Sequence, residues 1–317
     1  MSVGTDASIV LVSFNTREMT LACAASVYEE TRSDSAAKVI LVDNASSDGS
    51  AEAIAEQFPE IRLIASESNL GFAAANNLAA REATGRFILL LNPDTVVLNQ
   101  AIDRLVAFAD ANPDYGIYGG RTVFEDGSLN PTSVWRKPTV WNMFCRASGL
   151  SAMAKNSPLF SDDMYGGWER DSVREVDMVS GCFLLIRRAL WEELGGFDTS
   201  YFMYGEDWDL CLRARALGAR CLFCPDAEII HYGGASEPVR SDKLVRLFQT
   251  KVKLYRTHWG FFSGWALILL LWLWIARCVV MDSLLGIAGR AARRKSAAAW
   301  RDVGRRYREW MSTDAIE

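Results

Sequence analysis

The sequence lacks an excess of positive charge. Its 34 Lys and Arg residues are outnumbered by 39 Asp and Glu, so the formal net charge is −5 at pH 7. No nucleic acid is therefore expected as a partner. The charge is uneven, however, because residues 290–308 carry eight Lys or Arg against one Asp.

A second Cys-x-x-Cys pair, internal repeats and a leader pattern are also lacking. The seven cysteines are an odd number scattered mostly in apolar runs, which is typical of a reduced cytosolic chain. Cys221 and Cys224 are the only Cys-x-x-Cys pair, so we interpret them as buried apolar residues, with half a zinc or redox site as the alternative. There is no internal repeat or low-complexity linker, and residues 1–7 have no signal-peptide pattern.

The first part of the chain has an alternating strand and helix pattern. Continuous apolar strands predict a parallel sheet that is covered on both faces, in an α/β fold. Strands are expected at 8–14, 38–43, 61–64 and 86–91, and helices at 17–30, 48–58 and 72–83.

The pattern loosens after residue 98. Residues 135–171 are rich in aromatic residues, Gly and Ser, and we expect them to be irregular. Strands are expected at 116–124, 176–186, 219–224 and 227–231, and helices at 99–112, 206–217 and 243–257.

Two of the apolar strands run directly into an aspartate. Asp94 follows one strand through Asn92 and Pro93, and Asp43 ends another. Ligands of open α/β sheets bind at the carboxyl ends of the strands. Asp94 can hold a divalent cation there, and Asp43 can accept the N3–H of uracil or thymine, with turn or cap residues as the alternative for both.

Three further blocks carry polar or small residues at ligand-binding positions. Gly71 opens a helix with small residues, which allows a nucleotide to approach backbone N–H groups, although tight packing is the alternative. Asp207 lies among three carboxylates at a helix start, where it can be a general base or a helix-dipole partner. His231, one of two histidines, follows a strand and can be a metal ligand or a structural residue.

Taken together, these blocks resemble the family 2 glycosyltransferases of the GT-A fold, and most closely the rhamnosyltransferase type that uses a dTDP-sugar. The resemblance implies a Rossmann-like mixed, mainly parallel sheet flanked by helices. It covers about residues 8–236, in the family's order, through Ser13–Asn15, Val42–Asn44, Asn69–Phe72, Asn92–Asp94, Gly181, Gly195–Asp198, Glu206–Asp209 and His231.

The resemblance implies a role for each matching residue. Asp43 would read the pyrimidine, Asp207 would deprotonate the acceptor hydroxyl, and Asp94 with His231 would hold Mg²⁺ or Mn²⁺ near the diphosphate. Further nucleotide-sugar contacts would come from Ser13, Asn15, Asn44, Asp48, Asn69, Gly71, Asn76 and Asn92, and acceptor contacts from Gly181, Glu206 and Trp208.

One position departs from the family pattern. Asn92 stands where the family's metal motif begins with Asp, so the protein supplies fewer anionic ligands. Mg²⁺ commonly uses few carboxylates together with substrate phosphates, so this departure is compatible with a metal.

The implied reaction is a single in-line displacement with inversion at the anomeric carbon. The donor would be a dTDP- or UDP-sugar, with L-rhamnose as the expected sugar, and the acceptor a saccharide or lipid-linked saccharide used for cell-surface polysaccharide. A non-catalytic nucleotide-sugar-binding protein of the same fold is one alternative. A nucleotidyltransferase is another, although residues 13–17 lack the Gly-rich basic loop of that class.

A long apolar segment follows this part of the chain. Residues 259–276 contain no charge and would span about 27 Å as a helix, just under the roughly 30 Å hydrocarbon core. We expect an in-plane or re-entrant helix with peripheral membrane contact through 259–308, at the inner face of the cell membrane. A true span and a homodimer or core helix are the alternatives.

The sequence therefore predicts two regions. Residues 1–238 would form the catalytic domain, with a nucleotide-sugar half at 1–98 and an acceptor half at 99–238. Residues 239–317 would form a C-terminal helical extension, with an apolar segment at 259–289 and a basic tail at 290–308.

Overall fold

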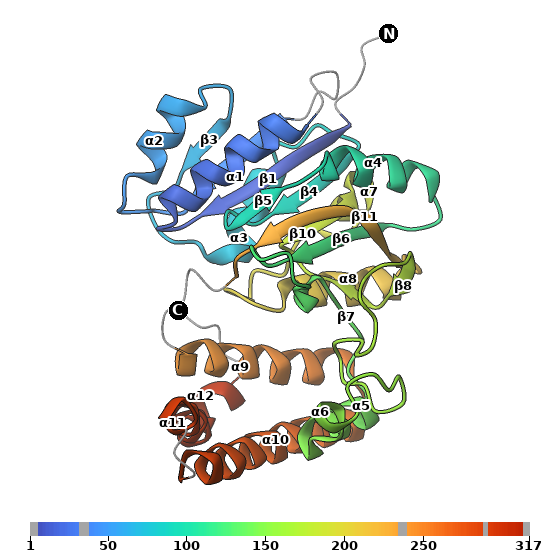
Figure 1. Cartoon of the computed structure of the whole chain (residues 1–317). Coiled ribbons are helices and arrows are strands. Elements are labelled where there is room, and N and C mark those ends of the chain that lie inside the picture. The colour runs from blue at the N-terminus through green and yellow to red at the C-terminus, as the bar shows by residue number, and fades with distance from the viewer. Residues whose placement is uncertain (1–5, 32–37, 234–239, 288–290, 313–317) are drawn as a thin grey trace. The chain divides into compact units, whose positions relative to one another are not determined.

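The computed structural model describes residues 6–31, 38–233, 240–287 and 291–312, shown in Figure 1. The chain forms two compact units. The first consists of residues 1–135 and 169–236, and the second of residues 136–168 and 237–317. The end of the resemblance at 234–236, the end of the apolar segment at 288–289 and the first residue of the basic tail at 290 lie outside the described residues.

The first unit is built on a mixed sheet. Among the described residues nine strands pair in the order β3-β2-β1-β4-β10-β6-β11-β5, with β8 beside β11. Neighbours β1, β2, β3 and β4 are parallel, and β10 is antiparallel to β4 and β6. The strands are β1 (Ala7–Ser13), β2 (Lys38–Asp43), β3 (Arg62–Ala65), β4 (Phe87–Leu91), β5 (Thr95–Val97), β6 (Ile117–Val123), β8 (Arg174–Val176), β10 (Phe183–Arg187) and β11 (Cys221–His231).

Helices cover both faces of this sheet. Side chains of α1, α2 and α4 join the strands in one large apolar core, while α3 and α8 lie on the other face (Figure 1). Strands β1 and β4 are entirely buried, which explains why their sequences are continuous apolar runs. The helices are α1 (Arg17–Glu30), α2 (Ser50–Gln57), α3 (Gly71–Ala80), α4 (Ala101–Ala111), α7 (Arg188–Leu194) and α8 (Glu206–Ala216).

Two strand predictions differ from the structure. The strand expected at 176–186 is broken at Ser180 and Gly181, and its first part, β9 (Met178–Val179), pairs with β7 (Val134–Trp135) in a separate sheet. The strands expected at 219–224 and 227–231 form one strand, β11. A register shift between Cys224 and Glu228 accommodates Pro225, which has no N–H for the ladder.

The cysteines of β11 lie in the interior of the first unit. Cys221 and Cys224 are buried and free, as expected for small apolar residues. Burial raises the pKa of the Cys224 thiol, which opposes the thiolate that a metal needs.

The second unit is helical, and part of it was not expected. Residues 140–153 fold as α5 (Val140–Ser148) and α6 (Leu150–Met153), within the segment expected to be irregular. A capping box explains the start of α5, because Thr139 and Asn142 exchange side-chain to backbone hydrogen bonds of 2.8 and 3.1 Å. The other helices are α9 (Arg240–His258), α10 (Phe261–Ile287), α11 (Ala291–Arg305) and α12 (Tyr307–Met311).

A buried ion cluster joins the two chain segments of the second unit. The fully buried Asp163 contacts Arg146 of α5 and lies 3.3 Å from Lys251 of α9. Charged groups are tolerated in such an interior only when they are paired. The cluster therefore ties residues 136–168 to the C-terminal helices, whereas the sequence division counted these residues with the catalytic domain.

Candidate active site

Polar side chains converge where the central strands end. Asp43 is the last residue of β2, and the parallel register places it opposite Ser13 of β1. Asp94 follows β4, and its neighbour Thr95 pairs with His231 at the end of β11. The topology therefore brings Asp43, Asp94 and His231 to one edge of the sheet.

Asp43 offers a buried acceptor atom. The residue is 3% exposed, and its Oδ2 accepts a 3.0 Å hydrogen bond from the Ser46 N–H. Its Oδ1 is buried and has no hydrogen-bond partner. An unsatisfied buried acceptor is costly, so a ligand N–H that reaches Oδ1 would be bound favourably.

The loops after β1 and β2 are held together by Asn15 and Asp48. Asn15 has φ +53°, and its Oδ1 accepts a 2.8 Å hydrogen bond from the Ser47 N–H. Asp48 accepts hydrogen bonds from the Arg17 N–H and from both the N–H and the hydroxyl of Ser50. Burial alone would raise the pKa of Asp48, but these hydrogen bonds lower it below its usual value. The two side chains thus order the loops that a nucleotide would contact.

A second set of hydrogen bonds fixes the start of α3. Asn44 donates to Asn69 Oδ1 at 2.9 Å and accepts from the Leu70 N–H at 2.8 Å. Gly71 has φ +78°, and a Cβ there would lie 2.6 Å from the carbonyl oxygen of Phe202. Gly71 is therefore required for α3 to begin against the segment that leads to Asp207.

Two predicted nucleotide contacts lie beneath this edge. Ser13 is fully buried, and its Oγ is 2.9 Å from the Thr20 hydroxyl. Asn76 is 1% exposed and donates a 2.8 Å hydrogen bond to the Phe72 carbonyl within α3. Their direct contact with a ligand stays a prediction.

Asp94 and His231 form the candidate metal site. Asp94 Oδ1 lies 3.5 Å from His231 Nε2, and its Oδ2 accepts from the Gly233 N–H at 3.1 Å. Burial favours a raised pKa for Asp94, but His231 and the backbone hydrogen bonds lower it, so the carboxylate is charged. Burial alone would lower the pKa of His231, but Cys182 and Asp94 raise it to about 10.

The donor atoms at this position are of the kind that a divalent cation takes, and a bound cation would displace the proton of His231. Asn92 Oδ1 and His231 Nδ1 are buried and have no hydrogen-bond partner. Among the described residues, no group of three His, Cys, Asp or Glu could hold a metal alone. The chain would therefore supply few ligands, and a diphosphate and water would supply the rest, as is usual for Mg²⁺.

Asp207 is held at the start of α8 by two backbone N–H groups. Its Oδ2 accepts from Gly181 at 2.9 Å, and its Oδ1 accepts from Trp208 at 2.8 Å. A Cβ on Gly181 would lie 3.6 Å from Asp207 Cβ and 3.5 Å from the Phe72 ring. Burial raises the pKa of Asp207 above its usual value, in the direction that suits a general base.

The neighbouring carboxylates of α8 have different environments. Glu206 is 5% exposed, and its Oε2 has no hydrogen-bond partner. Burial, followed by the charge of Asp207, raises the pKa of Glu206 well above its usual value. Asp209 is paired with Arg213 at 2.7 Å, which assigns it to the helix structure. Asp207 is therefore the carboxylate of this group that is both partly exposed and oriented by backbone donors.

An aromatic pair lies beside these carboxylates. The ring of Trp208 packs against Trp135, with centroids 5.2 Å apart. Sequence reasoning named Trp208 but missed Trp135, which belongs to the segment expected to be irregular. Trp135 reaches this position only because β7 pairs with β9, and no local sequence pattern predicts that pairing.

The chain is similar to known glycosyltransferases. Residues 8–194 match the family model Glycosyl transferase family 2. The chain is 30% identical over 210 residues to the N-acetylglucosaminyl-diphospho-decaprenol L-rhamnosyltransferase of Mycobacterium tuberculosis, a match that covers 61% of this chain and 66% of that protein. It is also 30% identical over 174 residues to Rhamnosyltransferase WbbL of Escherichia coli K12, covering 51% and 61% of the two chains. The chain thus matches slightly less than two thirds of the length of these relatives.

Solved structures share the fold. The mannosyltransferase PcManGT from Pyrobaculum calidifontis, in complex with GDP-Man and Mn²⁺, superimposes with a TM-score of 0.60 at 17% identity, over 95% of this chain and 85% of that one. GalNAc-T7 with UDP, GalNAc and Mn²⁺ gives a TM-score of 0.55 at 16% identity, over 81% and 49% of the two chains. The predicted GT-A-type α/β fold is confirmed.

Proposed function

Because the chain belongs to glycosyl transferase family 2, we propose that it transfers L-rhamnose from a dTDP- or UDP-linked donor to a saccharide or lipid-linked saccharide. The product would serve cell-surface polysaccharide synthesis. The observation that carries this proposal is that three aspartates at the site have different surroundings, each of which suits a different role. Asp43 has a free acceptor atom, Asp94 is charged beside His231, and Asp207 has a raised pKa beside Gly181.

The donor would bind across the ends of β2 and β4. The unpartnered Oδ1 of Asp43 would accept the pyrimidine N3–H, which is common to uracil and thymine. The ordered loops around Asn15 and Asp48 would frame the nucleoside. These groups are fixed before the donor arrives, so little ordering entropy opposes binding.

Asp94, His231 and Asn92 would hold Mg²⁺ or Mn²⁺ against the diphosphate. A cation bound there supplies charge neutralisation for the nucleoside diphosphate leaving group. Asp207 would accept the proton of the acceptor hydroxyl as that oxygen attacks the anomeric carbon from the face opposite the diphosphate. A single displacement inverts the configuration, so a β-linked L-rhamnose donor would give an α-linked product.

Glu206, the protonated member of the neighbouring pair Glu206 and Asp207, would bind the acceptor. Glu206 keeps its proton more readily than Asp207, because its Oε2 is buried without a partner. A protonated Glu206 can donate a hydrogen bond to an acceptor oxygen while Asp207 carries the charge. Trp208, packed against Trp135, would form an apolar wall beside them, and sugar rings pack well on such walls.

A lipid-linked acceptor would place the enzyme at a membrane. The nucleotide-sugar donor is cytosolic, so the reaction would occur at the cytoplasmic face. Peripheral contact through residues 259–308 is part of this proposal, and the exposed apolar side chains of α10 support it.

The test is calorimetric titration of the protein with dTDP and UDP, each with and without Mg²⁺ or Mn²⁺. Binding that needs the metal, and that falls in Asp94→Ala, is the expected result. Asp43→Ala is expected to weaken binding about tenfold or more, since it removes one buried hydrogen bond to the base. No binding in any condition would overturn the nucleotide site.

A second measurement separates transfer from binding alone. Incubation with dTDP-L-rhamnose and a GlcNAc-diphosphate lipid analogue is expected to release dTDP and extend the acceptor. Donor binding without transfer, across acceptors of this class, would favour the non-catalytic nucleotide-sugar-binding protein instead.

A further inference from the structure

Helix α10 carries an exposed apolar face along its whole length. Exposed side chains recur every three or four residues, so they lie on one side of the helix. Phe262 at one end is 87% exposed and Ile287 at the other is 79% exposed. The face consists of Phe262, Trp265, Leu269, Leu273, Ala276, Val280, Leu284 and Ile287. A continuous apolar surface of this length is typical of an interaction site.

The opposite face of α10 packs against its own unit. Leu267, Leu271 and Ile275 are buried, and the buried Asp282 is bonded to Arg293 of α11 at 2.8 Å. Only 33% of its most apolar 18 residues is buried, whereas the core helix of a soluble protein is mostly buried. A membrane span would remove the buried side chains from their neighbours and carry Asp282 into lipid, so a helix lying in the membrane plane fits both faces.

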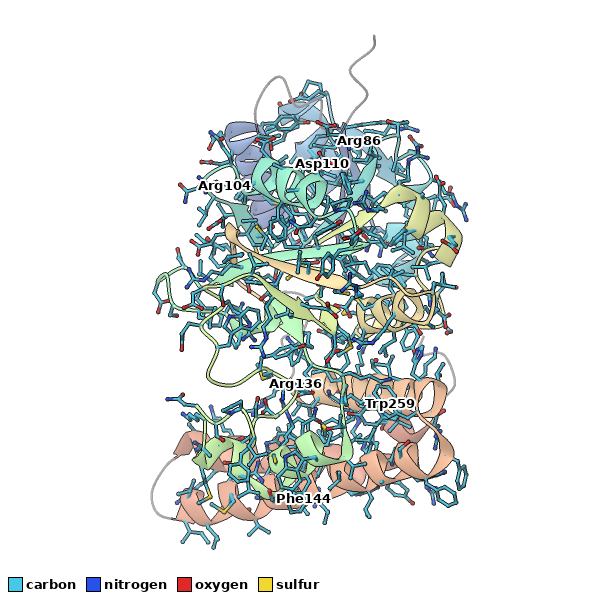
Figure 2. All side chains as sticks on the ribbon, turned by 90° about the vertical axis from the view of Figure 1, so that its right-hand side faces the viewer. Arg86, Arg104, Asp110, Arg136, Phe144 and Trp259 are labelled. Carbon is cyan, nitrogen blue, oxygen red and sulfur yellow. The ribbon has the colours of Figure 1, made fainter. Side chains whose placement is uncertain are left out.

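Helices α5 and α6 extend the exposed apolar face. Arg277 of α10 donates a 2.9 Å hydrogen bond to the Ala147 carbonyl and so fixes α5 beside α10. Phe144 of α5 lies at the edge of this unit that α10 also forms (Figures 1 and 2). The exposed apolar residues here are Val140, Trp141, Phe144 and Met153. The surface thus includes a segment more than a hundred residues before α10 in the sequence.

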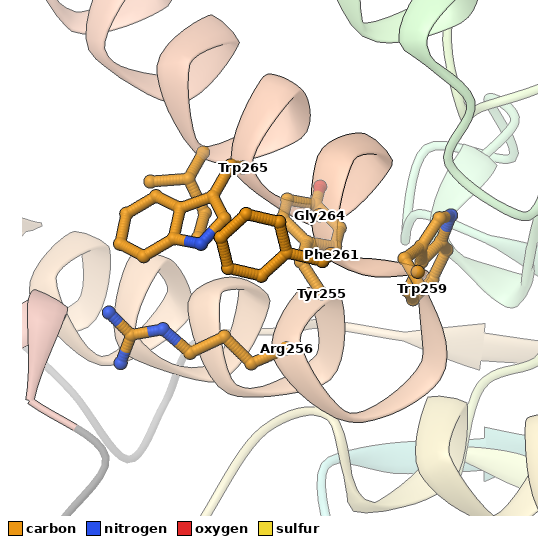
Figure 3. A pocket seen from close by; sticks show the side chains of 8 residues that line it. Tyr255, Arg256, Trp259, Phe261, Gly264 and Trp265 are labelled. Atoms are coloured by element: carbon orange, nitrogen blue, oxygen red, sulfur yellow. The ribbon is translucent and has the colours of Figure 1, made fainter.

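Both ends of the surface carry cations. At the α9–α10 corner the Arg256 guanidinium lies 5.5 Å over the ring of Trp265, beside Phe261 (Figure 3). At the other end, the start of α11 carries the exposed Arg294 and Lys295, and Arg294 donates a 2.9 Å hydrogen bond to the Gly286 carbonyl of α10. Tryptophan and basic residues at the border of an apolar surface are typical of contact with lipid headgroups.

We propose that this surface docks on an anionic phospholipid bilayer, with α10 in the membrane plane and α5 inserted beside it. The positive charge at both ends of the surface favours an anionic bilayer over a second copy of the chain, because two copies would bring cations together. In an antiparallel pair the Arg256 end of one copy would face the basic α11 of the other, and in a parallel pair like ends would meet. The inference deepens the proposed transferase function, because it names the surface that would bring the enzyme to a lipid-linked acceptor.

The test is flotation of the full chain with vesicles of phosphatidylcholine alone or mixed with phosphatidylglycerol, at low and high salt. The protein is expected to float with the anionic vesicles and to be released by salt. The double variant Leu269→Glu/Leu273→Glu is expected to bind about tenfold less or weaker still. Phe144→Glu is expected to weaken binding as well, which a surface limited to residues 259–308 does not predict.

A matched control lies in the first unit. Leu217 is a leucine of similar exposure outside this surface, so Leu217→Glu is expected to float like the wild type. Circular dichroism melts check that all variants are folded. Equal flotation of the double variant and wild type, or no flotation of the wild type, would overturn the proposal.

Other outcomes identify other occupants. A dimer in sedimentation that the double variant dissociates would assign the surface to a second copy. Resistance of the bound protein to alkaline carbonate would indicate a span. Transfer to a soluble acceptor analogue is measured in parallel. If the wild type transfers the sugar but does not float with vesicles, only the docking proposal is rejected. If it floats but does not transfer the sugar, only the proposed transferase activity is rejected.

Discussion

At the scale of single residues, Glu206 and Asp207 differ although they are neighbours in sequence. Asp207 accepts two backbone hydrogen bonds, whereas one carboxyl oxygen of Glu206 has no partner. Burial raises the pKa of both, and the charge of Asp207 adds to the effect on Glu206. Two carboxyl groups with different environments can thus divide the roles of base and hydrogen-bond donor.

This difference predicts the activities of two isosteric variants. Asp207→Asn is expected to lower kcat about 10²- to 10⁴-fold with little change in donor affinity, because it removes only the base. Glu206→Gln is expected to lose much less, since an amide resembles the protonated acid. Rhamnose transfer and dTDP titration measure the two effects, and equal losses in both variants would contradict the assignment.

The pH dependence follows from the same group. A base acts in its deprotonated form, so kcat is expected to fall as the pH falls through the raised pKa of the pair that contains Asp207. The acid limb should therefore lie above the usual range of an aspartate. A rate that is constant down to the ordinary aspartate pKa would argue that Asp207 is not the base.

At the scale of elements, Gly71 sets the distance between α3 and the segment before α8. Gly71→Ala is expected to cost about 1–2 kcal/mol for the left-handed backbone and about 1–3 kcal/mol more for the contact with Phe202. Gly127 has the same φ of +78° but no atom within 4 Å of a Cβ, so Gly127→Ala should show the backbone cost alone. Urea unfolding measures both, and equal costs would contradict the steric argument.

The buried ion cluster carries a second prediction at this scale. Burial favours a raised pKa for Asp163, but the charges of Arg146 and Lys251 lower it. Asp163→Asn is expected to destabilise the protein by about 3–5 kcal/mol at neutral pH, because Arg146 and the buried Lys251 lose the carboxylate that they share. Asp162 is less buried and contacts only Arg146 among the described pairs, so Asp162→Asn should cost less.

The sign of its pH dependence follows from the lowered pKa. An acid whose folded pKa is below its unfolded pKa adds stability above the unfolded value and loses it as the pH falls through the folded value. The difference between wild type and Asp163→Asn should therefore shrink on acidification. Denaturant unfolding across acid pH measures it, and a constant difference would show that the variant acts through packing.

Elements with strong local patterns could be predicted from the sequence, and elements that depend on distant partners could not. Helix α1 has the expected bounds, and β1, β2 and β4 lie within one residue of them, because buried strands are continuous apolar runs. The three-residue β5 and the pair β7–β9 exist only through pairing with distant strands. In the site, Asp43 and Asp94 could be predicted because each follows an apolar strand, whereas the position of Trp135 depends on the tertiary fold.

At the scale of the whole molecule, the chain leaves its first unit at residue 135, contributes 136–168 to the second and returns. The proposed donor site lies entirely in the first unit, and the proposed lipid surface entirely in the second. Each function should therefore respond to its own ligand.

Hydrogen exchange tests this separation. Saturating dTDP with Mg²⁺ is expected to slow amide exchange at the ends of β2 and β4 and the start of α3, because a ligand of the native state suppresses local opening. Amides of α9 and α10 should be unchanged, whereas anionic vesicles should protect α10 and α5. Protection by dTDP of α10 but not of β2 would contradict the placement of the site.

The ion cluster that joins the two segments of the helical unit has a consequence for synthesis on the ribosome. Asp163 and Lys251 are 88 residues apart, a length that takes about 4–18 s to translate at about 5–20 residues per second. During that interval α5 has been made but α10, which covers it, has not. Arg146 precedes Asp163 by only 17 residues, so it can neutralise the carboxylate of the nascent chain from the start. The face of α5 that packs on α10 has no such early partner, so it stays open to aggregation and to chaperones during this interval.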